Sequence, residues 1–399
     1  MSETRLPVLP LVSGFHREAE SLFRPLAEAF RGHGQVEVLS ADAATIASEP
    51  AHVLLVLSGG TEGEALAFAE KTRGPIILLS HPGHNSLPAA LEIAARLRQD
   101  GRIVQLIHLG ADARRLSVLT GAIALARGLR GQRVGLVGAP SPWLVASSPA
   151  PSVFQERLGV EVVSIPLEEV LKRVPSRPSS TVEGVGQGVG EEEREMGARV
   201  HASLLRIVEE GHLDALSIAC FGLLPHRMTA CWALSRLSDV GLPGGCEGDL
   251  PALLALMVAQ ELTGGPGFLA NPADVDLKRE TLTLAHCTVP LALTCSHVLR
   301  THFESGLGLA VAGDVKPGAY TLVRFGGRDL GQGFFVEGNV LSEPVGREDL
   351  CRTQLRFKMP RGAIERLLRE PLGNHHVLIP GSCRAVLSAF QELFLAGNA

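Results

Sequence analysis

The stretch that decides the fold class is His52–Ser58, which reads HVLLVLS and runs directly into a Gly-Gly-Thr turn. A second run of this kind, PIILLS at Pro75–Ser80, follows after helical sequence and ends in an HPGHNS loop. Apolar runs without alternation, separated by helices, are typical of parallel strands that are covered on both faces. We therefore expect a doubly wound, Rossmann-like α/β sheet, in which ligands bind at the loops after the strands. Both loops are also compatible with tight strand-to-helix turns and nothing more.

The same pattern continues into the middle of the chain and then changes. RVGLVG at Arg133–Gly138 and DALSIA at Asp214–Ala219 are again expected to be buried strands. Further on, short strand candidates follow one another with Gly, Pro and Asp turns, as in an antiparallel barrel or sandwich. We therefore predict two doubly wound α/β domains and a β-rich, barrel-like domain, at residues 1–131, 132–265 and 266–399.

Segment 176–193 interrupts the second of these domains. It contains the sequence PSSTVEGVGQGVGEEE, which is rich in Ser, Gly and acidic residues and has no periodicity. Such a composition buries too little apolar surface to offset backbone ordering, which costs about 1–2 kcal/mol per residue. We predict a mobile or irregular surface loop, which is either an inert insertion or a lid.

Composition and charge exclude several classes of function. The 399 residues include 37 basic and 42 acidic side chains, for a net charge of −5, and 4% are aromatic. Nucleic-acid binders usually show a basic excess or patch, and single-strand binders stack bases on aromatic side chains. The 45% hydrophobic and 20% charged residues are those of an ordinary globular protein. We therefore expect no nucleic-acid partner.

The cysteines and the apolar runs indicate a compartment. The seven cysteines are odd in number and form no C-x-x-C pair, which argues against a disulfide framework and a structural zinc site. The longest apolar run, Leu250–Ala259, is far shorter than the roughly 20 residues that span a bilayer. Pro7 and Pro10 break the first apolar stretch, unlike in a signal peptide. We expect a cytoplasmic protein without a membrane segment.

Glu247 is the acidic residue with the most suggestive surroundings. It stands between Gly245-Cys246 and Gly248, just ahead of a predicted helix whose N-cap is Asp249. Flanking glycines let the backbone approach a ligand closely, and a helix N-terminus favours a carboxylate. The motif alone leaves two interpretations open: Glu247 faces a ligand, or it is a solvated turn residue beside a capping Asp249.

Other polar residues of the third segment could complete a site with Glu247. The candidates are Asp274, His286, His302, His375 and His376. Adjacent side chains on an extended backbone point to opposite sides, so only one of the two neighbouring histidines is expected to bind. Each residue alone is a weak signal, since most histidines are structural. Together they offer one carboxylate and two or three imidazoles, which suit Mn²⁺ or a similar divalent ion.

Four motifs resemble those of the L-fucose isomerase and L-arabinose isomerase superfamily. They are GCEGD at 245–249, FLAN at 268–271, LAHC at 284–287 and NHHVL at 374–378. The chain is shorter than the characterised sugar isomerases and is more similar to a compact L-fucose isomerase-like branch. The resemblance implies two Rossmann-like domains and a β-rich domain, Mn²⁺ held between the second and third, and a homo-oligomer with active sites near subunit contacts.

The resemblance also assigns roles to single residues. It places Glu247 at the position of the first metal ligand and base, and His286 at that of a further ligand histidine. His375 matches the ligand histidine of the fucose enzyme, and His376 fits the arabinose enzyme about as well. The position of the second acid falls on Asn271, which is then a predicted metal ligand.

Asn271 raises a difficulty for the chemistry. An amide oxygen can bind a metal, but it cannot act as a general base. Either Asp274, three residues further on, supplies the second catalytic acid, or the reaction is not a simple isomerisation. We further predict that His302, Asn374 and His376 contact the substrate.

The function that these residues imply is a Mn²⁺-dependent aldose–ketose isomerase of a sugar or sugar derivative, acting through a metal-bound enediol. Such enolisation needs a Lewis acid on the carbonyl oxygen and a positioned base. Two alternatives remain: a non-catalytic sugar-binding or regulatory protein on the same fold, and an epimerase or lyase that uses the same metal enolate. Fold alone does not fix the activity, so these alternatives stay open. The expected partner in every case is a small carbohydrate.

Overall fold

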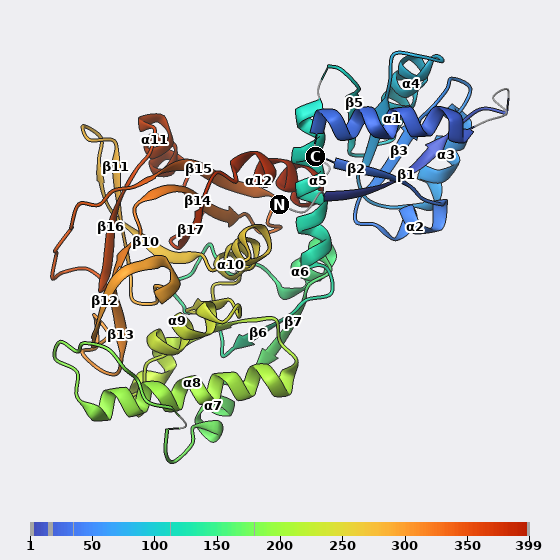
Figure 1. Cartoon of the computed structure of the whole chain (residues 1–399). Coiled ribbons are helices and arrows are strands. Elements are labelled where there is room, and N and C mark those ends of the chain that lie inside the picture. Colours follow the sequence, from blue (N-terminus) through green and yellow to red (C-terminus); the bar gives the residue numbers. More distant parts are fainter. Residues whose placement is uncertain (1–3, 15–18, 35, 112, 179, 397–399) are drawn as a thin grey trace. The chain divides into compact units, whose positions relative to one another are not determined.

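The computed structural model describes residues 4–14, 19–34, 36–111, 113–178 and 180–396 (Figure 1). The chain forms two compact units, Met1–Gly128 with Ala385–Ala399, and Leu129–Arg384. The end of the chain thus belongs to the same unit as its beginning, which the sequence did not indicate. The division into three domains at residues 131 and 265 stays a prediction.

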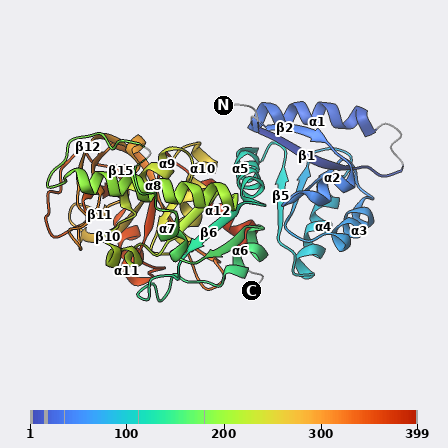
Figure 2. The same cartoon turned by 90° about the horizontal axis from the view of Figure 1, so that it is seen from below.

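The first unit is built on a parallel sheet of five strands in the order β2-β1-β3-β4-β5. The strands are β1 (Thr4–Leu11), β2 (Val36–Ser40), β3 (His52–Val56), β4 (Ile76–Ser80) and β5 (Val104–His108). The helices are α1 (Ala19–Gly34), α2 (Ala43–Ser48), α3 (Glu62–Lys71), α4 (Ser86–Gln99), α5 (Ala113–Leu129) and α12 (Arg384–Phe390). Figure 2 shows α1 on one side of this sheet and α3 and α4 on the other. Strands β3 and β4 are buried along their whole length, as their apolar sequences predicted.

Strand β1 was not predicted, because Pro7 and Pro10 interrupt it. The structure shows how both prolines are accommodated. Thr4–Val8 pairs only with β2, and Leu9–Leu11 pairs only with β3. Each half of the strand therefore needs hydrogen bonds on a single side, as an edge strand does, and edge strands tolerate a residue without an N–H group.

The second unit begins with a parallel sheet of four strands in the order β7-β6-β8-β9. The strands are β6 (Arg133–Val137), β7 (Glu161–Ile165), β8 (Ala215–Ile218) and β9 (Gly244–Cys246). The helices are α6 (Pro151–Leu158), α7 (Glu168–Arg173), α8 (Glu191–Gly211), α9 (Cys231–Asp239) and α10 (Leu250–Thr263). Strand β9 is short and lies at the edge, and the residue that follows it is Glu247.

The rest of the second unit is antiparallel. Six strands close into a barrel in the order β10-β11-β16-β15-β14-β17. They are β10 (Phe268–Asp276), β11 (Thr281–His286), β14 (Gly318–Gly326), β15 (Gln332–Val340), β16 (Thr353–Lys358) and β17 (His376–Pro380). Strands β12 (Thr294–Arg300) and β13 (Ala310–Val315) form a separate pair, and α11 (Arg361–Arg369) precedes β17. The prediction of an α/β protein with parallel sheets followed by an antiparallel, barrel-like part is confirmed.

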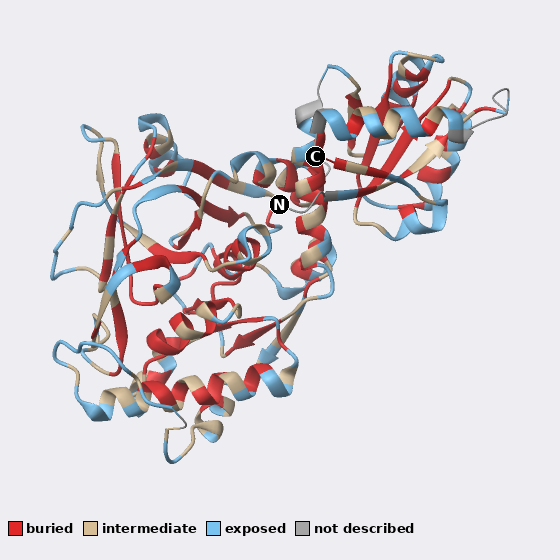
Figure 3. Ribbon diagram, in the orientation of Figure 1, coloured by how far each residue is buried: buried red, intermediate tan, exposed pale blue. Residues whose placement is uncertain are grey.

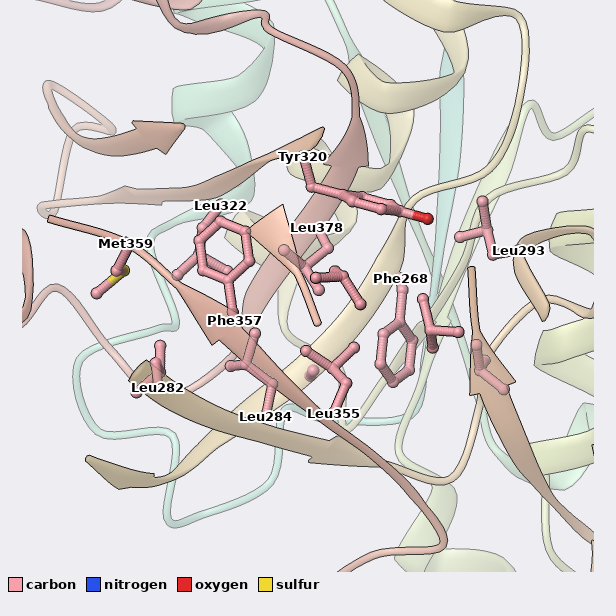
Figure 4. Packing of buried hydrophobic residues seen from close by; sticks show 14 of the residues in the cluster. Phe268, Leu282, Leu284, Leu293, Tyr320, Leu322, Leu355, Phe357, Met359 and Leu378 are labelled. Carbon is pink, nitrogen blue, oxygen red and sulfur yellow. The ribbon is translucent and has the colours of Figure 1, made fainter. Parts of the chain in front are cut away.

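Apolar side chains fill the barrel. Figure 4 shows Phe268, Leu284, Leu322, Leu355 and Leu378 converging from different strands on one cluster. Helix α10 packs both on the barrel strands β14 and β17 and on the parallel strands β8 and β9. The first ten residues of α10 are all buried (Figure 3). A helix that is enclosed in this way needs no polar face, which explains why these residues are apolar. This helix fixes the end of the parallel sheet against the barrel.

Segment 176–193 is irregular as far as Gly190 in the residues that the structure describes, and α8 begins at Glu191. The side chain of Arg194 donates hydrogen bonds to the carbonyls of Val182 and Gly184. The irregular loop is therefore held against the start of α8, and the prediction of an irregular segment agrees with the structure. In the described part of the chain, no helix is long and apolar enough to cross a membrane.

Candidate active site

Glu247 occupies a strained turn between β9 and α10. Its φ is 62°, and Gly248 follows with a φ of 72°. A side chain at Gly248 would place a Cβ 2.8 Å from Cα of Pro140, so only glycine fits there. A non-glycine residue in the left-handed region costs free energy and is tolerated where its surroundings enforce it, often at functional sites. The backbone of this turn therefore fixes the direction in which the Cα–Cβ bond of Glu247 leaves the chain.

The Glu247 carboxylate is largely buried and held from one side. The residue is 9% exposed, and its Oε2 accepts a hydrogen bond of 2.6 Å from Nε1 of Trp143. The backbone N–H of Ser141 donates to the Glu247 carbonyl at 2.9 Å, which ties the loop after β6 to this turn. A charge-assisted bond of this length orients the carboxylate.

His375 faces this carboxylate from the barrel. It lies just before β17 and is fully buried, and its Nε2 is 4.0 Å from Oε2 of Glu247. On the other side of the ring, Nδ1 lies 3.0 Å from Oδ2 of Asp249. Nε2 has no hydrogen-bond partner within the described residues. Buried polar atoms are normally satisfied, so this nitrogen is available to bind a ligand beside the Glu247 carboxylate.

Asp249 caps α10 and also binds a buried arginine. Its Oδ1 accepts from the N–H of Ala252 at 2.8 Å, as a helix N-cap does. Nη1 of Arg324 lies 3.1 and 3.0 Å from the two carboxylate oxygens. Burial alone would raise the pKa of Asp249, but Arg324 and the bonds from His375 and Ala252 outweigh it and hold this pKa below its usual value. Asp249 is thus an ionised, fully occupied carboxylate.

Arg324 links this group to two further segments. It projects from β14 with a fully buried side chain. Nη1 also donates to the carbonyl of His375 at 3.0 Å, and Nη2 donates to Oγ of Ser147 at 2.6 Å. Gly373 has a φ of 144°, and a Cβ there would lie 2.6 Å from Nη2 of Arg324. The glycine before the double histidine is therefore needed to make room for the arginine.

His286, at the end of β11, lies beside His375. The two rings meet edge to face with centroids 5.6 Å apart. Nδ1 of His286 is 2.8 Å from Oγ1 of Thr288. Burial, with the neighbouring His375, lowers the pKa of His286 to about 3. This imidazole is therefore neutral near pH 7 and keeps a lone pair for a proton or another cation.

The other histidine of the pair points elsewhere. His376 packs edge to face on Phe334, at 5.6 Å between centroids, and its Nδ1 is 2.8 Å from the carbonyl of Asn374. Phe334 belongs to the apolar cluster of the barrel. Burial lowers the pKa of His376 to about 4. The expected divergence of the two side chains is observed, and His375 is the one that faces Glu247.

Asn271 and Asp274 separate along β10. Asn271 pairs with Ala285, the neighbour of His286, and its Oδ1 is buried without a partner in the described structure. The ladder slips between Pro272 and Asp274, as at a β-bulge. A bulge re-aims the side chains that follow, and Asp274 is exposed and paired with a surface arginine. The structure therefore does not bring Asp274 to the corner formed by Glu247 and His375. Its predicted role as second acid finds no support in this geometry.

An aromatic row runs from Glu247 to His302. Trp143, which is 50% exposed, meets Phe221 edge to face at 5.0 Å, and Phe221 meets His302 in the same way at 5.7 Å. Nδ1 of His302 is 2.9 Å from Oγ of Ser305. His302, predicted as a substrate contact, is thus connected to the candidate site through this row.

Three residues of the site were missed or undervalued in the sequence. Trp143 is one of two tryptophans, and nothing in its loop predicted a contact with Glu247. Asp249 was interpreted only as a helix cap. Arg324 did leave a signal, because a charged residue stands in the apolar run TLVRF of a barrel strand. Charged residues are rarely buried without a partner, so this arginine could have been identified as paired.

The residues fit a metal ion only in part. Carboxylate oxygen and neutral imidazole nitrogen are suitable donors for Mn²⁺, and the orphan Nε2 of His375 beside Glu247 supplies one of each. Among the described residues, however, no group of three or more His, Cys, Asp or Glu side chains is placed to hold a metal. A bound ion would need a further donor, from an amide such as Asn271, from His286 after a small movement, or from the substrate.

Comparison with known proteins finds distant relatives, each named sulfoquinovose isomerase. The chain is 22% identical over 298 residues to that of Alkalicoccus urumqiensis, covering 70% of this chain and 67% of the relative. It is 22% identical over 169 residues to that of Priestia megaterium, covering 39% of this chain and 37% of the relative. A match to that of a Clostridium species is 29% identical over 99 residues, 24% of this chain and 22% of the relative.

These relatives bear on several predictions at once. No family model matches the chain, so the resemblance to the L-fucose isomerase superfamily stays a prediction. The match spans about two thirds of the first relative and little more than a third of the second. All the relatives are isomerases by name, which confirms the prediction of an enzyme of the isomerase class. The metal, the oligomeric state and the cytoplasmic location stay predictions. The chain is distantly related to isomerases that act on a sugar.

Proposed function

We propose that the chain is a sugar isomerase that interconverts an aldose and a ketose by moving a proton between C1 and C2. The observation that carries this proposal is the corner formed by Glu247 and His375. A carboxylate held by strain and by Trp143 faces a buried imidazole nitrogen without a partner, 4.0 Å away. Two proton acceptors that face each other across a gap attract either a cation or the hydroxyl groups of a ligand.

Glu247 is the general base in this proposal. Its carboxylate removes the proton from C2 of the aldose while a water molecule donates a proton to the C1 oxygen, and the enediol results. The same carboxylate returns its proton to C1 as the C2 hydroxyl gives its own to the resulting hydroxide, which regenerates the water and gives the ketose. A single base suffices when the carboxylate lies over the same face of the enediol at both C1 and C2. His375 binds a substrate hydroxyl through Nε2 and orients the sugar beside the base.

A divalent ion such as Mn²⁺ would bind at this corner through His375 and Glu247, with Asn271 or His286 as further donors. When bound, such an ion would stabilise negative charge on the substrate oxygens. Neutral His286, with its pKa near 3, is available as a donor throughout the physiological range. The chain's own residues then need only position the sugar and move one proton.

The substrate class follows from the relatives and from the aromatic row. Aromatic side chains with polar tips, such as Trp143 and His302, are common in ligand sites, where they offer an apolar face beside hydrogen-bonding groups. Because the relatives are named sulfoquinovose isomerase, sulfoquinovose is the first sugar to test. Neutral pentoses and deoxyhexoses complete the panel.

One observation favours a second candidate. Asn271 takes the place where the resemblance expects the second acid, and Asp274 is exposed. A protein that binds a sugar without converting it, or an epimerase or lyase with a single base, would be compatible with this loss of an acid. Both alternatives use the same corner and differ in the product.

The test is turnover in D2O with each sugar of the panel, with and without Mn²⁺, followed by NMR. We expect ketose formation, with deuterium at C1 in the fraction of turnovers in which the Glu247 carboxyl exchanges its proton with solvent before returning it. Binding without product favours the binding protein, an inverted or cleaved product favours the other enzymes, and a ketose formed at the full rate by Glu247→Gln contradicts the role of Glu247. The variant Glu247→Gln should lose turnover.

Glu280→Gln is a matched control for that variant. Glu280 is also a glutamate in the left-handed region, with a φ of 55°, but it lies in the turn between β10 and β11. Both substitutions replace a carboxylate by an amide at a strained backbone position. Equal losses of turnover in the two variants would show that backbone strain, and not the base at Glu247, explains the effect.

A further inference from the structure

We propose that Asp249 is a positioning residue that keeps His375 in one tautomer, with its hydrogen on Nδ1 and its lone pair on Nε2. The tautomer is a property of the protein without substrate, and its importance for catalysis rests on the proposed isomerase function. Asp249 does not touch the reacting atoms in this account. It acts through the ring of His375, while Arg324 keeps Asp249 itself in place.

Both oxygens of the Asp249 carboxylate are occupied by hydrogen-bond partners. Oδ1 accepts from Ala252 and from Arg324, and Oδ2 accepts from Arg324 and lies 3.0 Å from Nδ1 of His375. An ionised carboxylate accepts hydrogen bonds and donates none. The hydrogen between Asp249 and His375 must therefore belong to Nδ1, which leaves Nε2 of a neutral ring unprotonated.

Arg324 holds Asp249 and His375 in their relative positions. Its guanidinium balances the charge of Asp249 and at the same time binds the carbonyl of His375 at 3.0 Å. The arginine thus fixes both ends of the bond between Asp249 and His375. Its other nitrogen is anchored to Ser147, in the loop that also carries Trp143. A ring held by its backbone and by Nδ1 cannot easily turn to exchange its two nitrogens.

A gap separates Nε2 of His375 from the Glu247 carboxylate. If the hydrogen were on Nε2, a donor would face the Glu247 carboxylate, and the two side chains could close into a direct hydrogen bond. Instead their atoms stay 4.0 Å apart, and Nε2 is without a partner in the described residues. Partners of a ligand histidine are known to fix its tautomer in this way. Asp249 therefore decides whether the corner is open to a substrate hydroxyl or a cation.

The substitution Asp249→Asn separates the two tautomers. One oxygen is still needed by Ala252 and Arg324, so the amide nitrogen of the asparagine takes the place of Oδ2 and donates to Nδ1 of His375. The hydrogen of the ring must then move to Nε2. We expect the tautomer to invert, with Nε2–H now directed at Glu247.

The experiment is two-dimensional NMR of the long-range couplings between ring protons and nitrogens in ¹⁵N-histidine-labelled protein freed of metal by chelation. His375→Gln assigns the signals. In the unsubstituted protein we expect Nδ1 at the shift of a protonated nitrogen and Nε2 at that of an unprotonated one, and in Asp249→Asn the reverse. Asp239→Asn is the matched control, because Asp239 is also a buried, arginine-paired carboxylate that accepts a backbone N–H, and it should leave the His375 signals unchanged.

Each result decides something. A protonated Nε2 in the unsubstituted protein, alone or together with Nδ1, overturns the proposal even if Asp249→Asn fails to fold. An unchanged tautomer in folded Asp249→Asn overturns it as well. If the tautomers behave as expected but no sugar is converted, the positioning role stands and the isomerase proposal fails.

Discussion

Two aspartate–arginine pairs of the second unit have nearly the same geometry and very different surroundings. Arg324 lies 3.0 Å from Asp249, and both side chains are 0% exposed. Arg347 lies 3.2 Å from Asp274, and these side chains are 42% and 59% exposed. Asp274 was predicted as a catalytic acid and Asp249 as a mere helix cap, whereas the structure places Asp249 beside His375.

The role of a carboxylate depends on its surroundings. Asp249 is removed from water, so each of its bonds restricts a neighbour, and the chain of contacts reaches Nε2 of His375. Asp274 is solvated, and Arg347 also binds Asp349. Exposed ion pairs contribute little, about 0–1 kcal/mol, while breaking a buried pair leaves an uncompensated charge.

The largest effect on stability is expected for Arg324→Leu. The substitution leaves Asp249 ionised, buried and without its cation, which should lower the free energy of unfolding by about 3–5 kcal/mol. Urea denaturation followed by circular dichroism measures this change. A loss below about 1 kcal/mol would mean that water reaches Asp249, and the contrast between the two pairs would disappear.

A smaller effect is expected on acidification. Burial lowers the pKa of His286 to about 3 and that of His376 to about 4, from an ordinary value near 6.5. Between these values the unfolded chain binds more protons than the folded one, so stability is complete above about pH 6.5 and is lost as the pH falls. Each histidine should remove about 2 kcal/mol at pH 5.

Denaturation at pH 7, 6 and 5 tests this prediction. His376→Gln should reduce the slope of stability against pH, and His226→Gln, at an exposed histidine, serves as the comparison. Stability that stays constant from pH 7 to 5 would show that the two imidazoles are not buried in neutral form.

Trp143→Phe should act on the site more than on the fold. The substitution keeps an aromatic ring against Phe221 and removes the N–H that binds Glu247. Hydrogen bonds to charged groups contribute about 1.5–3 kcal/mol when buried. Because Trp143 is half exposed, we expect about 1 kcal/mol in stability. We also expect roughly a tenfold loss in kcat/KM from a less ordered base.

Steady-state kinetics beside thermal denaturation separate the two contributions for this variant. Trp232→Phe, at the chain's other tryptophan, which packs under Arg236, should alter stability without a specific loss of turnover. Full activity in Trp143→Phe would show that Glu247 needs no help from the indole.

The smallest effect is expected for Arg347→Leu at the exposed pair. The free energy of unfolding should change by less than about 1 kcal/mol, and the same urea experiment as for Arg324→Leu measures it. A loss as large as that of Arg324→Leu would show that exposure is a poor guide to the value of these pairs.

Much of the fold could be predicted from the sequence because the pattern of apolar residues within each element indicates its type. Continuous apolar runs predicted β3 and β4, and the change to short strands predicted the antiparallel part. Strand β1 was missed because its prolines are acceptable only when each half pairs on one side, which depends on its neighbours. The grouping of the last residues with the first unit depends likewise on contacts between distant parts of the chain.

Part of the candidate site could be predicted from local sequence. Glu247 beside Gly248 and the double histidine were both predicted, and the structure brings Glu247 and His375 together, while their roles stay predictions. The alternation of an extended backbone predicted that only one histidine would face Glu247. The exposed position of Asp274 could not be predicted, because a bulge after Pro272 turns the strand, and a shift of one residue exchanges the two faces. Arg324 was missed because its partner lies 75 positions away in the sequence.

The role of Glu247 as the base is decided by the turnover of Glu247→Gln and Asp274→Asn, measured side by side on the sugar that the unsubstituted protein converts. Removing a general base costs about a hundredfold to ten-thousandfold in rate. We predict a loss of this size for Glu247→Gln and a change within about threefold for Asp274→Asn, with both proteins folded. If Asp274→Asn loses turnover and Glu247→Gln keeps it, the reactive acid lies on β10, and the account of the Glu247–His375 corner is wrong.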